Sequence, residues 1–421
     1  MIKPEQAVIL CGGLGTRLRP LTDNLPKPMV DVNGQPFLLH LMEQLSDAGT
    51  NKFLLLTGYL AEKISTFFGD GSQWGWEITY HVGPVEWDTG RRLWEARELI
   101  NERFMFLYSD NYATFRFSEL LELHIKNRPA LSLLLKSKPS ANVALGNDGF
   151  LENYDKTRNS PDLNYVELGY MIAEKQQIFD AYDDFEKAPD ISFSEILAKL
   201  VSTRQVAGLI LPVPYYSVSD PERLELLRTY LRPKKILLLD RDGTINTKAP
   251  RGEYITRWSD MEILPEAVSG LQKLADAGFT FAVISNQAGI ARGILSAEIV
   301  SEINSRLSEF FHDKGVEMID FYVCPHHWDE GCMCRKPKPG MFHTCSEDHL
   351  LRLDQTIYVG DDPRDCEAAR QAGCQSIFVG NTDELDDVTR DLPLTICSSI
   401  DSATNVIIDY YENRGRDGTL L

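Results

Sequence analysis

This sequence lacks the features of several protein classes. None of its apolar runs approaches the ~20 residues that a helix needs to cross a bilayer, so we expect no membrane association. The opening apolar run, Ala7 to Leu10, is too short for the core of a signal peptide. Internal repeats and low-complexity segments are absent. Basic residues are in deficit, and the net charge of −19 argues against nucleic-acid binding. Any phosphate site must therefore concentrate its few Arg and Lys locally.

The eight cysteines do not follow the spacing of a disulfide framework. Five are scattered, which suits a reducing compartment, and we expect a cytoplasmic protein. The other three cluster with a histidine in Cys324-Pro-His326-(x5)-Cys332-Met-Cys334. Three thiols and one imidazole at this spacing match a closed tetrahedral Zn²⁺ site. Because the protein would fill all four positions, we predict a structural zinc.

The length of 421 residues exceeds a single ordinary core and predicts two or three domains. A short basic linker, Arg232-Pro-Lys-Lys235, separates a predicted helix from a new apolar strand. We therefore predict one domain over residues 1–231 and a second over residues 232–421. The predicted fold class is α/β, with a doubly wound sheet in the first domain and a Rossmann-like sheet in the second.

In the first domain, the strand-like run Ala7 to Leu10 leads into Cys11-Gly-Gly-Leu-Gly-Thr-Arg-Leu-Arg-Pro20. Glycines in such a loop let backbone N–H groups turn toward an anion without interference from Cβ atoms. Positive charge for phosphates is available from Arg17 and Lys27. No Gly-Lys-Ser/Thr follows, so the loop is not a P-loop. A helix is predicted over Asp31 to Leu45.

The combined string G-G-x-G-T-R-L followed by P-K-P resembles the sugar-1-phosphate nucleotidyltransferases. This resemblance implies that a nucleoside triphosphate binds to Gly12, Gly13, Gly15, Thr16, Arg17 and Lys27. It also implies an Mg²⁺ ligand at Asp110, which follows the predicted strand Phe104 to Tyr108, and a sugar contact at Glu167.

Two stretches depart from that family. Its second metal-binding Asp corresponds to Ser217 here, and Asp220 comes three residues late. The base-recognition stretch that often reads L-G-T-A-G begins here as Trp87-Asp-Thr89. Two carboxylates hold a metal better than one. Two interpretations therefore stay open for the first domain: nucleotidyl transfer, or binding of a sugar nucleotide without catalysis.

The second domain opens with the apolar run Ile236 to Leu239, which predicts a strand buried on both faces. Asp240 and Asp242 follow at its carboxyl end, where ligands bind in open α/β sheets. Residues i and i+2 of an extended chain point the same way, so both carboxylates face one pocket. Such a pair requires a shared cation or proton.

Three further groups stand at predicted strand ends or in a constrained loop. Ser285 follows the strand Phe281 to Ile284, and Arg335-Lys336 follows the cysteine cluster directly. Asp361 follows the strand Thr356 to Val359. A hydroxyl and a cation suit phosphate oxygens, and carboxylates at a strand end suit a hard dication such as Mg²⁺. The tail carries one predicted helix, Ser399–Glu412.

This order of motifs resembles the haloacid-dehalogenase superfamily of phosphatases. The resemblance implies that Asp240 is the nucleophile, that Asp242 is the general acid and base, and that Ser285 and Lys336 hold the phosphoryl oxygens. It assigns Mg²⁺ to Asp240, the backbone carbonyl of Asp242 and Asp361, and leaves Asp362 and Asp365 outside the ligand set. Asn286 and Arg335 are predicted substrate contacts.

The inserted cysteine loop narrows the resemblance to heptose bisphosphate and histidinol-phosphate phosphatases. Removing the 7-phosphate of D-glycero-D-manno-heptose 1,7-bisphosphate leaves a sugar 1-phosphate, the substrate class of the first domain. We therefore predict a bifunctional enzyme that acts on a sugar bisphosphate and a nucleoside triphosphate. The alternative is a histidinol-phosphate phosphatase with a non-catalytic sugar-nucleotide-binding domain. The anomer, the base and the oligomeric state stay open.

Overall fold

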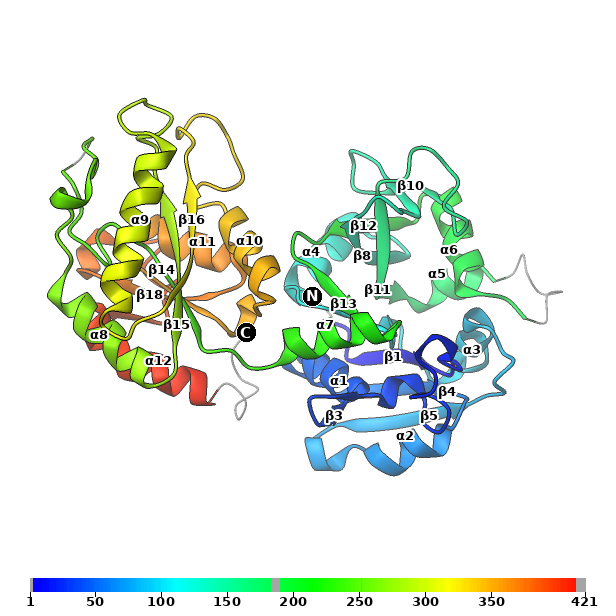
Figure 1. Cartoon of the computed structure of the whole chain (residues 1–421). Helices are drawn as coiled ribbons and strands as arrows, with labels where there is room; N and C mark the ends of the chain where they lie inside the picture. The colour runs from blue at the N-terminus through cyan, green and yellow to red at the C-terminus, as the bar shows by residue number, and fades with distance from the viewer. Residues whose placement is uncertain (1–2, 183–189, 251, 414–421) are drawn as a thin grey trace. The chain divides into compact units, whose positions relative to one another are not determined.

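The computed structural model describes residues 3–182, 190–250 and 252–413 (Figure 1). The chain divides between Leu231 and Arg232 into two compact units, here called the N-terminal and C-terminal domains. Both are α/β, as the sequence predicts. In the part of the chain that the structure describes, no helix combines the length and hydropathy that a bilayer crossing requires.

The N-terminal domain contains a nine-stranded sheet and two small two-stranded sheets. Its strands are β1 (Gln6–Cys11), β2 (Asp31–Val32), β3 (Gln35–Pro36), β4 (Lys52–Thr57), β5 (Glu77–Val82), β6 (Arg103–Tyr108), β7 (Asn111–Ala113), β8 (Leu131–Ser137), β9 (Val143–Leu145), β10 (Leu151–Tyr154), β11 (Tyr165–Glu174), β12 (Val206–Ile210) and β13 (Tyr215–Ser217). Its helices are α1 (Phe37–Asp47), α2 (Ala61–Phe68), α3 (Thr89–Glu95), α4 (Phe117–Asn127), α5 (Lys175–Asp180), α6 (Phe193–Ser202) and α7 (Pro221–Leu231).

Strand β1 is central to this sheet. All six of its residues are buried, and it pairs in parallel with β4 on one side and β6 on the other. A strand covered on both faces is apolar throughout, which explains the continuous apolar run in the sequence. The carboxyl ends of β1 and β6 therefore lie side by side. They carry the glycine-rich loop and Asp110.

The predicted helix over Asp31 to Leu45 is wrong in its first part. Residues 31–36 form the β2–β3 hairpin, and α1 begins only at Phe37. The turn is Asn33-Gly34, in which both residues have positive φ, 55° and 89°. Asn-Gly is the strongest two-residue hairpin signal, and Pro36 has an extended backbone that separates the hairpin from the helix.

The C-terminal domain is a six-stranded sheet in the order β16-β15-β14-β17-β18-β19, and every pair is parallel. Its strands are β14 (Ile236–Leu239), β15 (Thr280–Asn286), β16 (Met318–Cys324), β17 (Ile357–Gly360), β18 (Gln375–Val379) and β19 (Thr395–Cys397). Its helices are α8 (Pro265–Asp276), α9 (Ala297–His312), α10 (Gly340–His349), α11 (Pro363–Ala372) and α12 (Ile400–Asn413).

Helices cover both faces of this sheet. Apolar residues of α8, α9 and α12 pack with Leu237 and Leu239 of β14 in one core. Helices α10 and α11 cover the opposite face, where Phe342 packs edge to face on Tyr358. Because β14 lies between β15 and β17, the residues at the carboxyl ends of these three strands meet at one edge. The sequence places Asp240, Ser285 and Asp361 there.

Gly270 of α8 is the point of close approach between α8 and α12. A Cβ at this position would lie 2.7 Å from the backbone nitrogen of Asp401 and 2.9 Å from its Cα. Alanine normally gains about 1 kcal/mol over glycine inside a helix, but overpacking against backbone costs typically 1–3 kcal/mol. We therefore expect Gly270→Ala to destabilise the C-terminal domain.

Hydrogen exchange of the α8 and α12 amides in the full-length chain measures this effect, because it reports on that domain alone. Exchange should be faster in Gly270→Ala. Glu266→Ala, an exposed position on the same helix, serves as the control and should leave exchange nearly unchanged. Slower exchange in Gly270→Ala would show that the helices have room for the methyl group.

Candidate active sites

The centre of the C-terminal site is a buried cluster of opposite charges. Asp240, the first residue after β14, is 8% exposed, and Lys336 is 3% exposed. Lys336 Nζ lies 2.7 Å from Asp240 Oδ1 and 2.8 Å from Asp365 Oδ1. It also donates to the Ile284 carbonyl at 2.9 Å and lies 2.6 Å from the Tyr358 hydroxyl. The ammonium group is therefore fixed from four directions at the end of the sheet.

Burial and neighbouring charges set the proton affinities in this cluster. Burial raises the pKa of Asp240, Lys336 opposes the rise, and the Asp365 and Asp361 carboxylates add to it, so that the pKa is about 7. Burial alone would lower the pKa of Lys336, but Asp240 and Asp365 raise it to about 12. Lys336 is therefore a permanent cation. Because the carboxylates outnumber it, the site attracts a second cation.

Asp242, two residues after Asp240 in the sequence, has different neighbours from Asp240. Arg241, 1% exposed, donates from Nη2 to Asp242 Oδ2 at 2.9 Å. Asn246 Nδ2 and Gln287 Nε2 donate to the same carboxylate at 3.0 and 2.7 Å. Burial would raise the pKa of Asp242, but the Arg241 guanidinium and these hydrogen bonds hold it below its usual value. Asp242 therefore rests as a carboxylate.

Ser285 is joined to Asp242 through one side chain. Gln287 Nε2 donates to Ser285 Oγ at 2.9 Å as well as to Asp242. Ser285 belongs to the last part of β15, which extends to Asn286, two residues beyond the predicted strand. Its hydroxyl thus lies at the same edge of the sheet as Asp240 and is buried at 2% exposure.

Three carboxylates at this edge form a candidate metal site. Asp240, Asp361 and Asp365 each offer an oxygen, and these oxygens lie within 4.8 Å of one another. A donor set made only of carboxylate oxygens fits a hard dication such as Mg²⁺. The backbone at Gly243 (φ 99°) passes close by, since a Cβ there would lie 2.1 Å from Asp361 Oδ2. Lys248 Nζ lies 2.7 Å from the same oxygen.

The loop that carries Lys336 is held at two points. Asn286 accepts a hydrogen bond from the Lys336 backbone N–H at 3.0 Å and donates to the Lys336 carbonyl at 3.1 Å. Asn286 therefore holds the loop in place, and it is also a predicted substrate contact. Arg335 is half-buried, and its Nη1 donates to the His326 carbonyl at 3.4 Å, which ties it to the cysteine cluster.

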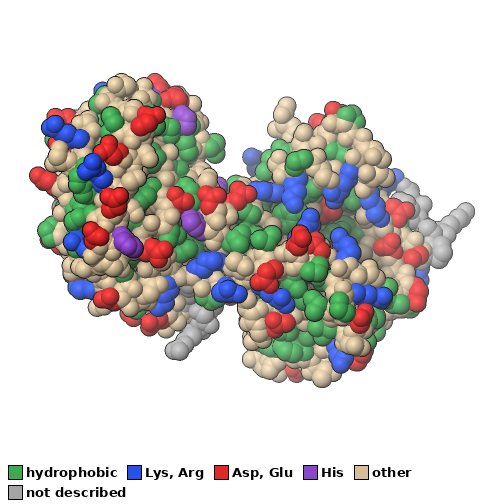
Figure 2. Space-filling model, in the orientation of Figure 1, with side chains coloured by type: hydrophobic (Ala, Val, Ile, Leu, Met, Phe, Trp, Pro, Cys, Tyr) green, Lys and Arg blue, Asp and Glu red, His purple; other side chains and the backbone are tan. Residues whose placement is uncertain are grey.

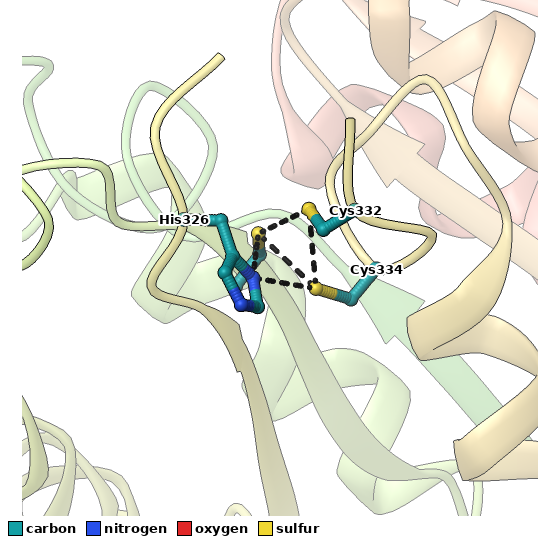
Figure 3. A group of neighbouring side chains, drawn as sticks. His326, Cys332 and Cys334 are labelled. Carbon is teal, nitrogen blue, oxygen red and sulfur yellow. Dashed lines mark hydrogen bonds between the residues drawn. The ribbon is translucent and has the colours of Figure 1, made fainter. Parts of the chain in front are cut away.

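The four predicted zinc ligands converge (Figure 3). Sulfur–sulfur distances among Cys324, Cys332 and Cys334 are 3.4, 3.5 and 3.7 Å. His326 Nδ1 lies 3.1 Å from Cys334 Sγ and 3.7 Å from Cys324 Sγ. A tetrahedron with Zn–S bonds of about 2.3 Å has edges of about 3.8 Å. The residues therefore fit a four-coordinate zinc.

In the N-terminal domain the glycine-rich loop leaves β1 and reaches solvent. Gly13, Thr16 and Arg17 are exposed. Gly15 has φ 63°, in the left-handed region that favours glycine, and a Cβ there would lie 2.9 Å from Lys27 Cβ. Figure 2 shows basic side chains around a hollow on the visible face of this domain. The loop therefore has backbone and charge available for an anion.

Asp110 stands at the end of β6, beside that loop. Lys27 Nζ lies 3.1 Å from Asp110 Oδ2, whereas Asp110 Oδ1 is buried and makes no hydrogen bond to described residues. Strand β13 pairs with β7 so that Ser217 lies opposite Asn111, next to Asp110. Ser217, the residue that the family resemblance matches to a second carboxylate, thus lies adjacent to Asp110.

Asp220, three residues after Ser217, has a partner on α7, the helix that follows it. Its side chain faces Arg223 at 3.4 Å and accepts from the Arg223 backbone N–H at 3.0 Å. Glu167 of β11 is a buried carboxyl group on which the charge of Asp110 acts. Burial first and then Asp110 raise the pKa of Glu167 to about 8. Glu167 therefore favours its neutral form at neutral pH.

Sequence reasoning missed several participants in the C-terminal site. Asp365 was left outside the ligand set but lies in the carboxylate cluster and pairs with Lys336. Its spacing from Asp362 was a usable signal, because the two form a capping box that turns Asp365 inward on the first turn of α11. Tyr358, Gln287 and Lys248 carried no such signal.

Comparison with known proteins shows the family of each domain. Residues 6–143 match the Nucleotidyl transferase family model, and residues 333–402 match the HAD-hydrolase-like model. The chain is 38% identical over 146 residues to a D-glycero-beta-D-manno-heptose-1,7-bisphosphate 7-phosphatase from Pseudomonas aeruginosa. That alignment covers 35% of this chain and 81% of the relative. The chain belongs to this phosphatase family.

The chain also matches phosphatases that are named for the alpha anomer of the heptose bisphosphate. A D-glycero-alpha-D-manno-heptose-1,7-bisphosphate 7-phosphatase from Mycobacterium tuberculosis is 37% identical over 155 residues, covering 34% of this chain and 78% of the relative. A solved structure from Bacillus anthracis, assigned as a glucose-1-phosphate thymidylyltransferase, shares the fold of the N-terminal domain. Its TM-score is 0.50 at 18% identity, and the alignment covers 54% of this chain and 95% of that one.

These findings confirm the predicted families. The C-terminal domain is a phosphatase domain of the haloacid-dehalogenase superfamily, and the N-terminal domain is a nucleotidyl transferase domain. The chain is therefore an enzyme, a hydrolase joined to a domain of the nucleotidyl transferase family. We refer to the two parts below as the phosphatase domain and the nucleotidyl transferase domain.

The cysteine cluster yields a testable prediction. Cys332→Ser removes one ligand, and we expect the zinc content per chain to fall by at least half, because serine is a poor ligand for zinc. Exchange of the amides at residues 325–336 should rise at the same time. Metal analysis and hydrogen exchange measure the two effects.

Cys397→Ser is the matched control, since Cys397 is a half-buried cysteine in β19 outside the cluster. It should leave zinc content and loop exchange unchanged. Full zinc content in Cys332→Ser would show that the ligand assignment is wrong.

Proposed function

We propose that the phosphatase domain removes the 7-phosphate of D-glycero-D-manno-heptose 1,7-bisphosphate, and that the nucleotidyl transferase domain joins the resulting heptose 1-phosphate to a nucleoside triphosphate. The observation that carries the first step is the Asp240–Lys336–Asp365 cluster, in a chain that spans 81% of a heptose bisphosphate phosphatase at 38% identity. The second step rests on the family of the N-terminal domain.

In this proposal Asp240 attacks phosphorus. A carboxylate oxygen of Asp240 forms the new P–O bond, the bond to the sugar oxygen breaks, and an aspartyl-phosphate results. Lys336, held 2.7 Å from Asp240, neutralises phosphoryl oxygens as the leaving group departs. The Ser285 hydroxyl donates to the same phosphoryl group. Mg²⁺ bound by Asp240, Asp361 and Asp365 would screen the repulsion between carboxylate and phosphate.

Asp242 carries the proton in both halves of the reaction. Its pKa is depressed by Arg241, Asn246 and Gln287 against the effect of burial, so it is a carboxylate in the resting site. The negative charge of a bound phosphate raises its proton affinity and favours the acid that the leaving alkoxide requires. After the sugar leaves, the Asp242 carboxylate accepts a proton from the water that hydrolyses the aspartyl-phosphate.

A second candidate function for the N-terminal domain is supported by one observation. Ser217 stands beside Asp110 where a carboxylate would complete a two-acid metal site, and Lys27 already pairs with Asp110 at 3.1 Å. One carboxylate holds a dication less firmly than two. The glycine-rich loop and Asp110 would serve equally in a domain that binds a sugar nucleotide without catalysing its formation.

The phosphatase proposal is tested by phosphate release from a panel of substrates with Mg²⁺ present. The panel comprises both anomers of heptose 1,7-bisphosphate, fructose 1,6-bisphosphate and histidinol phosphate. We expect a heptose bisphosphate to be preferred. Asp240→Asn should lower kcat by about 10³-fold or more, because an amide oxygen is not a competent nucleophile.

Asp354→Asn is the matched control. Asp354 pairs with Arg352 on a short helical turn before β17, and its loss should leave kcat within about twofold. Turnover by Asp240→Asn at more than a tenth of the wild-type rate would show that Asp240 is not the nucleophile. Preference for histidinol phosphate would sink the substrate assignment.

The nucleotidyl transferase proposal is tested by pyrophosphate release from heptose 1-phosphate and a panel of nucleoside triphosphates. We expect one triphosphate to support turnover, and Asp110→Asn to reduce it by about 100-fold, because the neutral amide is a poor metal ligand. Asp23→Asn, an exposed acid in an ion pair with Arg19, is the control. Sugar-nucleotide binding by the wild-type chain without pyrophosphate release would favour the binding-module alternative.

A further inference from the structure

The most unusual buried charge outside the phosphatase site is Arg92 of α3. Its residue is 4% exposed. The guanidinium donates from Nη1 to the Thr57 carbonyl at 2.9 Å and from Nη2 to the Pro84 carbonyl at 2.6 Å. Gly83 O lies 3.5 Å from Nη1. These partners are the last residue of β4 and the two residues after β5, so Arg92 ties together the carboxyl ends of two neighbouring parallel strands.

The guanidinium also lies directly behind the glycine-rich loop. A Cβ on Gly12 would lie 2.4 Å from Arg92 Cζ, and a Cβ on Gly58 would lie 2.7 Å from Nη2. The loops after β1 and β4 thus close on the guanidinium, and the Tyr59 N–H donates to the Gly12 carbonyl at 3.3 Å. Only glycine at position 12 allows the loop backbone to approach the charge so closely.

This charge has no counter-ion among the described residues. The partners of the guanidinium are neutral carbonyls, and no described carboxylate forms an ion pair with it. Asp190, Asp88 and Glu86 act on it from farther away. Asp88 and Asp190 have partners of their own, the Thr89 and Asp88 backbone N–H groups, each at 2.6 Å. A buried charge without a counter-ion is costly, and an anion arriving at the loop would recover part of that cost.

We propose that Arg92 is a positioning residue and buried counter-charge for the nucleoside triphosphate site: it fixes the glycine-rich loop from behind and attracts the phosphates through the Gly12 backbone without touching them. The inference rests on the proposed nucleotide site of the N-terminal domain. Arginine stays protonated at all physiological pH values, so the attraction is permanent. In a buried setting one charge acts over several ångströms with little screening.

The two parts of this role are separated by two substitutions in the full-length chain. Arg92→Gln keeps amide N–H donors for the carbonyls but removes the charge. Arg92→Lys keeps the charge but loses the planar fork that reaches two carbonyls. Arg97→Gln is the control, because Arg97 is partly exposed and lies 3.6 Å from Glu98 and over the Trp94 ring.

Binding is measured by titration calorimetry. The five common nucleoside triphosphates are screened on the wild-type chain, and the best one is then compared with its monophosphate on each variant. We expect Arg92→Gln to weaken triphosphate binding roughly tenfold and monophosphate binding less, since the attraction grows with ligand charge. Arg92→Lys should keep the ratio of the two affinities within about threefold of wild type, and Arg97→Gln should change neither.

The outcomes separate this inference from the function on which it rests. If the wild-type chain binds no nucleotide, the proposed nucleotide site and this inference both fall. If it binds and Arg92→Gln retains wild-type affinity, or loses triphosphate and monophosphate by the same factor, the charge role of Arg92 alone is overturned. Should Arg92→Gln fail to fold, a tenfold change of the affinity ratio in Arg92→Lys would overturn it instead.

Discussion

The phosphatase domain depends on one buried ion cluster. Lys336 is surrounded by Asp240, Asp365, a carbonyl and a tyrosine hydroxyl, at a place where water contributes little. Removing Lys336 would leave uncompensated carboxylates in the interior, which is far more costly than losing a surface ion pair. Much of the surrounding structure holds these charges in place: three parallel strands end there, and α11 begins there.

The cysteine cluster belongs to the same arrangement. Lys336 follows Cys334 by two residues, and Asn286 brackets its backbone from β15. A loop that carries an exposed Trp328 and Met333 has little core of its own. Four soft ligands within one short segment supply the order that apolar packing does not, and a zinc ion would make that order depend on metal rather than on burial.

The two domains bury charge in opposite ways. In the phosphatase domain the lysine is matched by carboxylates, and the surplus of acids suits a metal. In the nucleotidyl transferase domain the hydrogen-bond partners of Arg92 among the described residues are backbone carbonyls, and Asp190, Asp88 and Glu86 act on its charge from farther away. Local arrangement and not overall charge sets the potential at each site, so the net charge of −19 is compatible with the phosphate binding that we propose. The proposed reactions are consecutive, since the product of one has the 1-phosphate that the other requires.

The sequence by itself determined the strand-end carboxylates, the glycine-rich loop, the cysteine cluster and both families. These features depend on residues that are close in the sequence. An apolar run followed by Asp240 and Asp242 predicts a buried strand with two carboxylates at its end, whatever the rest of the fold. It failed at Asp31 to Val32, where an Asn-Gly turn overrode helical periodicity. Only the tertiary structure decided what lies next to what. Asp365, Tyr358 and Gln287 join the phosphatase site through strand order and helix capping, and Arg92 reaches Gly12 across 80 residues of chain. Such contacts arise from packing between distant segments, and no local pattern in the chain encodes them.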